Sequence, residues 1–147
     1  MNTPAVMSRL QPPRIVLLDD ERHMLQLYEL YLRDWFHEPE LVGFRNGDAA
    51  WLELEHAAAD LLITDWRHPG LDAGDLVRKL AAARMKVPVL IVSACDADCV
   101  RELGGLGFKV AFLQKPFGYK QLWKAVNELA GPCDFPAHST EYIRQFA

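Results

Sequence analysis

The sequence is poor in several features that mark major classes of protein. Only three of its 147 residues are cysteine, and a small odd number is typical of a reducing cytoplasm and not of a disulfide framework. No apolar run approaches the length that crosses a bilayer, and the N-terminus lacks the apolar stretch of a signal peptide. The net charge of −4 is the opposite of the basic excess of nucleic-acid binders. We therefore expect a cytoplasmic protein without membrane insertion and without direct nucleic-acid binding.

What is present is the composition of a folded domain. Half of the residues are hydrophobic and 24% are charged, which is typical of a globular chain and excludes a disordered one. Five short apolar runs alternate with longer amphipathic stretches, and such runs are typical of strands buried on both faces. The runs are residues 15–18, 41–44, 61–63, 87–92 and 110–113.

The stretches between these runs have the spacing of helices. Met24, Tyr28, Tyr31 and Trp35 recur at intervals of four, three and four residues, which places them on one helical face. The alternation predicts a doubly wound, five-stranded parallel sheet in a three-layer α/β/α arrangement. Further helices are predicted over residues 50–57, 76–83, 96–103 and 122–129.

The chain divides into three parts. Residues 1–13 are predicted as a leader, 14–130 as the domain, and 131–147 as a C-terminal tail or linker. The tail carries several apolar side chains, so we expect it to dock, to pair with another chain or to lead to a further domain. These side chains are Phe135, Tyr142, Ile143 and Phe146.

Polar residues follow four of the five predicted strands. In open α/β sheets, ligands bind just beyond the carboxyl ends of the strands. We therefore expect these side chains to meet at one edge of the sheet. They are Asp19, Asp20 and Glu21 after the first strand, Asp65 after the third, Ser93 after the fourth and Lys115 after the fifth.

This set of side chains points to phosphate chemistry with a cation. Two carboxylates about 4 Å apart repel by roughly 4 kcal/mol at an effective dielectric of 20. A hard divalent cation relieves that repulsion, and Mg²⁺ is the usual choice where phosphate also binds. A carboxylate can attack phosphorus to form an aspartyl-phosphate, and cations lower the barrier by neutralising phosphoryl oxygens. We therefore expect Asp65 to be the acceptor, with Lys115 and Ser93 contacting the phosphoryl group.

In their order and spacing, five motifs resemble the receiver domain of two-component response regulators, the CheY-like family. The motifs are residues 16–21 (VLLDDE), 47–49 (GDA), 65–72 (DWRHPGLD), 93–94 (SA) and 115–117 (KPF). The resemblance covers roughly residues 14–130. It implies a flavodoxin-like fold and a phosphoprotein of signal transduction. Such a protein is not a metabolic enzyme but a phosphoacceptor that catalyses its own phosphotransfer and dephosphorylation.

The resemblance also implies roles for individual residues. A histidine kinase or phosphotransfer protein would pass a phosphoryl group to Asp65. Asp20 and Asp65 would hold Mg²⁺ through their side chains, with Asp19 nearby through water and the backbone carbonyl of Arg67 completing the ligands. Ser93 would bind the phosphoryl group together with Lys115. An adjacent Lys115–Pro116 cis bond is expected to hold the lysine inward.

An output surface is implied as well. Phe112 occupies the aromatic switch position, where tyrosine is common. Movement of Ser93 toward the phosphoryl group would vacate space that Phe112 can fill. The face made by the helix at 96–103, the strand at 110–113 and the last helix would then bind a downstream protein or a second copy. It would include Val100, Lys109, Val110 and parts of the segment from Lys120 to Lys124.

Two departures from the family pattern lie after Asp65. His68 stands where methionine is common, and Ala73 stands where glycine is usual. They leave open a degenerate receiver that acts as a phosphorylation-independent interaction module. We interpret His68 as a loop packing residue and not as a metal ligand, while Trp66 could either report on metal binding or line the loop.

Other functions fit the sequence less well. A flavodoxin-like FMN site needs a hydroxyl- and glycine-rich loop after the first strand, where this chain has adjacent acids. A dehalogenase-type phosphatase would need Asp-x-Asp at that place. Cys95 and Cys99 lie four residues apart, which fits two small buried residues better than a metal or redox site.

Overall fold

The computed structural model describes residues 12–94, 101, 103 and 109–130. Several expectations fall outside this part of the chain. They concern residues 1–11 of the leader, most of the predicted helix at 96–103, the tail at 131–147, and the three cysteines Cys95, Cys99 and Cys133.

The predicted sheet is confirmed. Five parallel strands lie in the order β2-β1-β3-β4-β5, so the chain winds first to one side of β1 and then to the other. The strands are β1 (Arg14–Leu18), β2 (Glu40–Phe44), β3 (Leu61–Asp65), β4 (Val89–Ser93) and β5 (Val110–Gln114).

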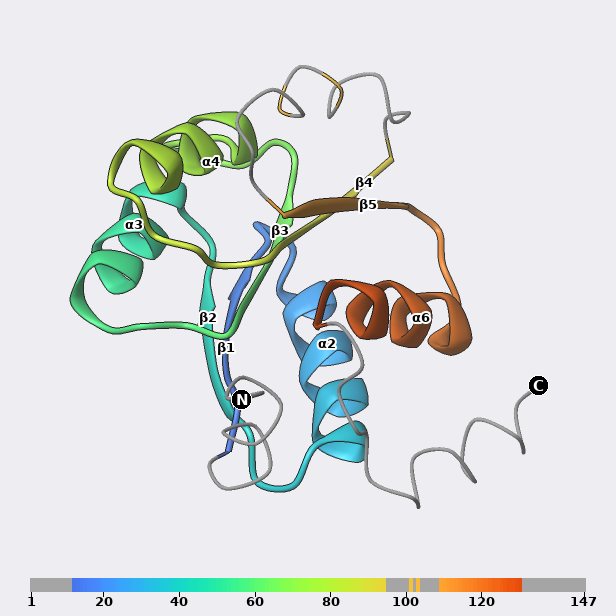
Figure 1. The fold of residues 1–147 in the computed structure, drawn as a ribbon. Coiled ribbons are helices and arrows are strands. Elements are labelled where there is room, and N and C mark those ends of the chain that lie inside the picture. Colours follow the sequence, from blue (N-terminus) through green and yellow to red (C-terminus); the bar gives the residue numbers. More distant parts are fainter. Residues whose placement is uncertain (1–11, 95–100, 102, 104–108, 131–147) are drawn as a thin grey trace.

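Two helices cover each face of the sheet among the described residues (Figure 1). On one face, α2 and α6 enclose a core around Leu17, Ile63 and Leu90. On the other, α3 and α4 enclose a core around Leu62 and Ile91. The helices are α2 (Arg22–Trp35), α3 (Gly47–His56), α4 (Ala73–Ala82) and α6 (Tyr119–Ala130).

Local sequence explains where the two helices α3 and α4 begin. The side chain of Asn46 accepts hydrogen bonds from the backbone N–H groups of Asp48 and Ala49, and Asp72 accepts one from Asp75. Both residues thus satisfy amide groups that a helix start leaves unpaired. Helix α2 begins directly after the acids that follow β1, which places its N-terminus at the carboxyl edge of the sheet.

The strand bounds differ from the expected ones in three ways. Strand β4 begins at Val89, two residues later than predicted, because its ladder with β3 and β5 starts there and Pro88 has no amide hydrogen. Ser93 and Asp65 are the last residues of their strands and do not follow them. Strands β2 and β5 are edge strands and are only partly buried, so burial on both faces holds for the three central strands alone.

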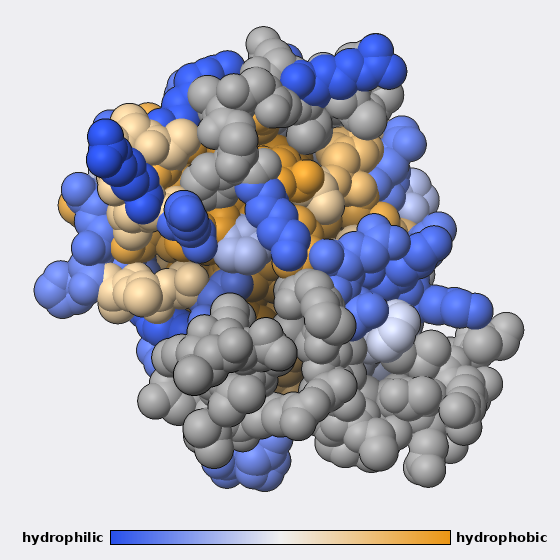
Figure 2. All heavy atoms as spheres, in the orientation of Figure 1, coloured by the Kyte–Doolittle hydropathy of each residue, from blue (hydrophilic) through white to orange (hydrophobic). Residues whose placement is uncertain are grey.

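Hydrophilic and hydrophobic residues are unevenly distributed over the surface of the protein. In Figure 2, hydrophilic residues make up most of the coloured periphery of this face, and hydrophobic residues lie toward its centre. None of the described helices combines the length and the apolar character needed to span a bilayer.

Candidate functional site

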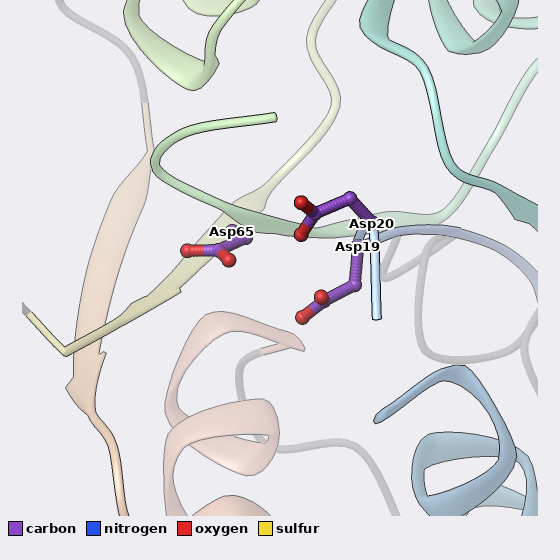
Figure 3. A group of neighbouring side chains, drawn as sticks. All are labelled: Asp19, Asp20 and Asp65. Atoms are coloured by element: carbon purple, nitrogen blue, oxygen red, sulfur yellow. The ribbon is translucent and has the colours of Figure 1, made fainter. Parts of the chain in front are cut away.

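Three carboxylates gather at the carboxyl edge of the sheet, as the sequence predicts. Asp19 and Asp20 follow β1, and Asp65 ends the neighbouring strand β3. Their nearest oxygen atoms all lie within 4.8 Å of one another. Figure 3 shows the Asp19 and Asp20 side chains extending toward the side on which Asp65 lies. We call Asp19, Asp20 and Asp65 the acid cluster.

Asp19 is the buried member of the acid cluster. It has no exposed surface, its Oδ1 accepts the Glu21 amide at 2.9 Å, and its Oδ2 lies 3.1 Å from Lys115 Nζ. The Asp19 amide donates to the Phe44 carbonyl at 3.1 Å. Burial raises the pKa of the Asp19 carboxyl above its ordinary value, and the two hydrogen bonds to its oxygens do not fully offset this.

Lys115 bridges two members of the acid cluster. Its Nζ lies 3.1 Å from Asp19 Oδ2 and 3.3 Å from Asp65 Oδ2, with Glu21 Oε1 at 4.0 Å. Burial lowers the pKa of the ammonium, but the attraction of Asp19 and Asp65 outweighs this effect, and the pKa lies above its ordinary value. Lys115 therefore stays charged. The bond from Lys115 to Pro116 is cis, as expected.

The loop after β3 holds Asp65 by its other oxygen. Asp65 Oδ1 accepts the backbone amide of Trp66 at 2.7 Å, while the Trp66 ring is buried in the core under α4. His68 Nε2 lies 3.2 Å from Thr64 Oγ1, which fits a role in loop packing. Ala73 is buried, begins α4 and donates its amide to the Trp66 carbonyl at 3.1 Å, so the loop closes without a glycine there.

Asp20 and Arg67 lie on the solvent side of the site. Both residues are exposed, and the Asp20 carbonyl accepts a hydrogen bond from Arg45 Nε at 3.0 Å. The Arg67 carbonyl accepts no backbone hydrogen bond from another described residue outside helices and strands. The exposed Asp20 carboxylate and the Arg67 carbonyl can therefore bind a cation without disrupting contacts in the core.

Ser93 and Phe112 lie on the same face of adjacent strands. In the ladder between β4 and β5, Ile91 pairs with Phe112 and Ser93 pairs with Gln114, so Phe112 and Ser93 are diagonal neighbours. Ser93 is 4% exposed, and Phe112 is partly buried against the core under α3 and α4. The Lys115 amide donates to the Ser93 carbonyl at 2.8 Å.

Arg45 contacts the acid cluster through the Asp20 carbonyl and was not predicted as a site residue. Arg45 directly follows β2, and its place after a strand end is its only signal in the sequence. Tyr28 was assigned to the core from its helical spacing, and it is indeed fully buried. Its spacing could not indicate where its hydroxyl points.

The chemistry of these donors suits a hard cation. Three carboxylates converge beside one ammonium, so negative charge exceeds positive charge among these four groups. All the side-chain donors of the cluster are oxygen atoms, which is the ligand type of Mg²⁺ and Ca²⁺ and not of softer metals. The arrangement can therefore bind a divalent cation next to Asp65 and Lys115.

Comparison with known proteins gives consistent results. The family model of the response regulator receiver domain matches residues 15–127. The chain is 34% identical to the response regulator GtcR of Aneurinibacillus migulanus over 70% of this chain and 41% of GtcR. It is 30% identical to the chemotaxis protein CheY of Pseudomonas aeruginosa over 79% of this chain and 94% of CheY.

A solved structure agrees with this result. The response regulator receiver protein from Pseudomonas putida superposes with a TM-score of 0.68 at 26% identity, covering 80% of this chain and 98% of that one. The matched region spans less than half the length of GtcR and nearly all of CheY. The ordered motifs, the fold and these matches agree: the chain belongs to the receiver domain family of two-component response regulators.

Proposed function

We propose that Asp65 accepts a phosphoryl group from a histidine kinase or phosphotransfer protein in a Mg²⁺-dependent reaction, and that this chain works as a phosphorylation switch. The observation that carries the proposal is the position of Lys115. Its ammonium lies between the carboxylates of Asp19 and Asp65, at 3.1 and 3.3 Å. A charged lysine beside the proposed acceptor can stabilise the negative charge that the phosphoryl oxygens carry during the transfer.

The chain's own residues would do most of the work. An Asp65 carboxylate oxygen attacks the phosphorus of a phosphohistidine, an O–P bond forms and the N–P bond breaks, and the leaving imidazole takes up a proton from water. Lys115 exchanges part of its contact with Asp65 for a phosphoryl oxygen. The Ser93 hydroxyl, at the end of the adjacent strand β4, donates to another phosphoryl oxygen.

The acid cluster would hold the metal. Asp20 and Asp65 supply side-chain oxygens, the Arg67 carbonyl supplies a backbone oxygen, and Asp19 binds through water. When bound, Mg²⁺ would supply positive charge to the phosphoryl oxygens in addition to that of Lys115. The buried position of Asp19 supports an indirect role, and the exposure of Asp20 supports a direct one.

The output would follow from the diagonal placement of Ser93 and Phe112 on adjacent strands. A phosphoryl group carries close to two negative charges and draws the Ser93 hydroxyl toward it. Phe112 then fills the space that Ser93 leaves, which biases the surface around β5 and α6 toward one of two pre-existing states. A downstream protein or a second copy of the chain binds that surface more tightly after phosphorylation.

The test is labelling with a small phosphodonor such as acetyl phosphate, with and without Mg²⁺. We expect a label that requires Mg²⁺ and is absent from Asp65→Asn, whose fold is checked by circular dichroism. Asp60→Asn is the matched control, because Asp60 lies near the other end of β3 and accepts the Arg14 amide. A label that persists in Asp65→Asn would refute the assignment of the acceptor. No label in the wild type would favour a receiver that works without phosphorylation.

A further inference from the structure

Tyr28 is a buried tyrosine whose position relates it to the acid cluster. It lies on α2, which begins at Arg22 next to that cluster, and it has no exposed surface. Its ring stacks on Phe117, with centroids 6.2 Å apart and planes 5° from parallel. Phe117 follows Lys115 by two residues, so the stacked pair belongs to the segment that carries the site lysine. Helical side chains tilt toward the helix N-terminus, which directs Tyr28 toward the acid cluster.

The hydroxyl of Tyr28 has no hydrogen-bond partner among the described residues. A buried polar group without a partner is uncommon, because it loses its hydrogen bonds to water on folding. Burial and then the negative charges of three site acids raise the pKa of this phenol, so it keeps its proton and remains a donor. These acids are Asp19, Asp65 and Glu21. The hydroxyl makes no direct hydrogen bond to these carboxylates.

We propose that the Tyr28 hydroxyl donates a hydrogen bond to an ordered water that in turn donates to the Asp19 carboxylate, so that Tyr28 is a positioning residue of the cation site. The inference that this link affects Mg²⁺ rests on the proposed function. A water is the smallest group that joins a donor and an acceptor separated by more than one hydrogen-bond length, and buried waters of this kind satisfy otherwise unpaired polar groups. Asp19 then has three restraints: the Glu21 amide, Lys115 and the water held by Tyr28.

The first experiment needs no metal. Melting temperatures in EDTA are measured for Tyr28→Phe, Asp19→Asn and the double variant. Tyr28→Phe keeps the stacked ring and removes only the oxygen. If the hydroxyl and the carboxylate are linked, the shift of the double variant differs from the sum of the single shifts by about 3 °C. Additive shifts would overturn the proposal, since an unlinked hydroxyl acts alone.

The second experiment measures Mg²⁺ binding by calorimetry. Loss of one net hydrogen bond behind Asp19 should weaken binding by about threefold to tenfold in Tyr28→Phe. Tyr31→Phe is the matched control, because it deletes the same atom from the same helix, where the ring contacts Trp35 and Tyr119. Equal affinity in wild type and Tyr28→Phe would overturn the effect on the cation site. Absence of Mg²⁺ binding in the wild type would instead refute the proposed function. The melting temperatures in EDTA would then decide by themselves whether Tyr28 and Asp19 are linked.

Discussion

The ammonium nitrogen of Lys115 lies 3.1 Å from the carboxylate of Asp19, a fully buried residue 96 positions earlier in the chain. The contact joins the end of β5 to the end of β1, two strands that are not neighbours in the sheet. Without a metal, the Lys115 ammonium therefore offsets part of the negative charge of these carboxylates. A divalent cation would offset the same charge. A bound cation would share the acid cluster with this lysine.

Replacement of Lys115 should therefore separate metal binding from phosphorylation. Lys115→Met removes a positive charge that repels a nearby cation, so Mg²⁺ affinity should rise by about threefold or more. Phosphorylation by acetyl phosphate should fall by about tenfold or more, because the phosphoryl oxygens lose their cationic contact. Calorimetry and a labelling time course check the two effects. A parallel fall in both quantities would show that the lysine supports metal binding.

Replacement of Asp20 should weaken metal binding without harming the fold. Asp20 is exposed, so Asp20→Ala should change the free energy of unfolding by less than about 1 kcal/mol. The Kd for Mg²⁺ should rise by about tenfold or more, because a charged ligand is lost. Asp48→Ala removes the same charge from another exposed residue and serves as the control. Calorimetry measures the Kd of both variants and of the wild type.

The raised pKa of Asp19 predicts how stability depends on pH. A carboxyl whose pKa rises on folding contributes stability below its ordinary pKa of 3.8 and loses it as the pH rises through the raised value. Asp19→Asn has no such loss, and its oxygen can still accept the Glu21 amide. The stability of the metal-free variant should therefore increase relative to that of the wild type as the pH rises from below 3.8 toward neutrality. Urea unfolding in EDTA measures this difference, and a decrease with rising pH would contradict it.

The loops after β2 and β3 meet at Gly47. Its amide donates to the Pro69 carbonyl at 2.8 Å, and a Cβ at this position would lie 1.9 Å from the Leu71 oxygen. Because the obstructing atoms are backbone, Gly47→Ala should cost about 2 kcal/mol or more. Gly43→Ala is the control, since its Cβ would lie 3.7 Å from a Leu25 methyl group. Equal stability of the two variants would show that the loops separate freely.

The proposed switch should be visible with beryllofluoride, a stable stand-in for the phosphoryl group. In the wild type, changes in the NMR chemical shifts of backbone amides should extend from Asp65 to residue 109 and to residues 110–113 of β5. In Phe112→Ala they should shrink there and persist around Asp65, because the aromatic ring that fills the vacated space is missing. Two-dimensional NMR checks both spectra. Shifts confined to the site in the wild type would mean that the signal does not reach this surface.

The sequence by itself determined the sheet and the convergence of the acids. Continuous apolar runs separated by amphipathic stretches leave few chain paths, and right-handed crossovers bring the strand ends to one edge. Asp19, Asp20, Asp65 and Lys115 could therefore be predicted to meet. Side-chain periodicity reports which face is buried, and the order of the motifs reports which strand end carries each polar group.

Only the tertiary structure decided how these groups divide their contacts. The family resemblance implies different metal roles for the adjacent acids Asp19 and Asp20, but only the structure shows that Asp19 is buried against Lys115 while Asp20 is exposed. Spacing placed Tyr28 on a helical face without showing that its buried hydroxyl has no hydrogen-bond partner among the described residues. Nothing near Gly47 in the sequence indicated that the Leu71 backbone lies against it. The physical reason is that such contacts join atoms distant in sequence, and their geometry depends on how whole strands and loops pack together.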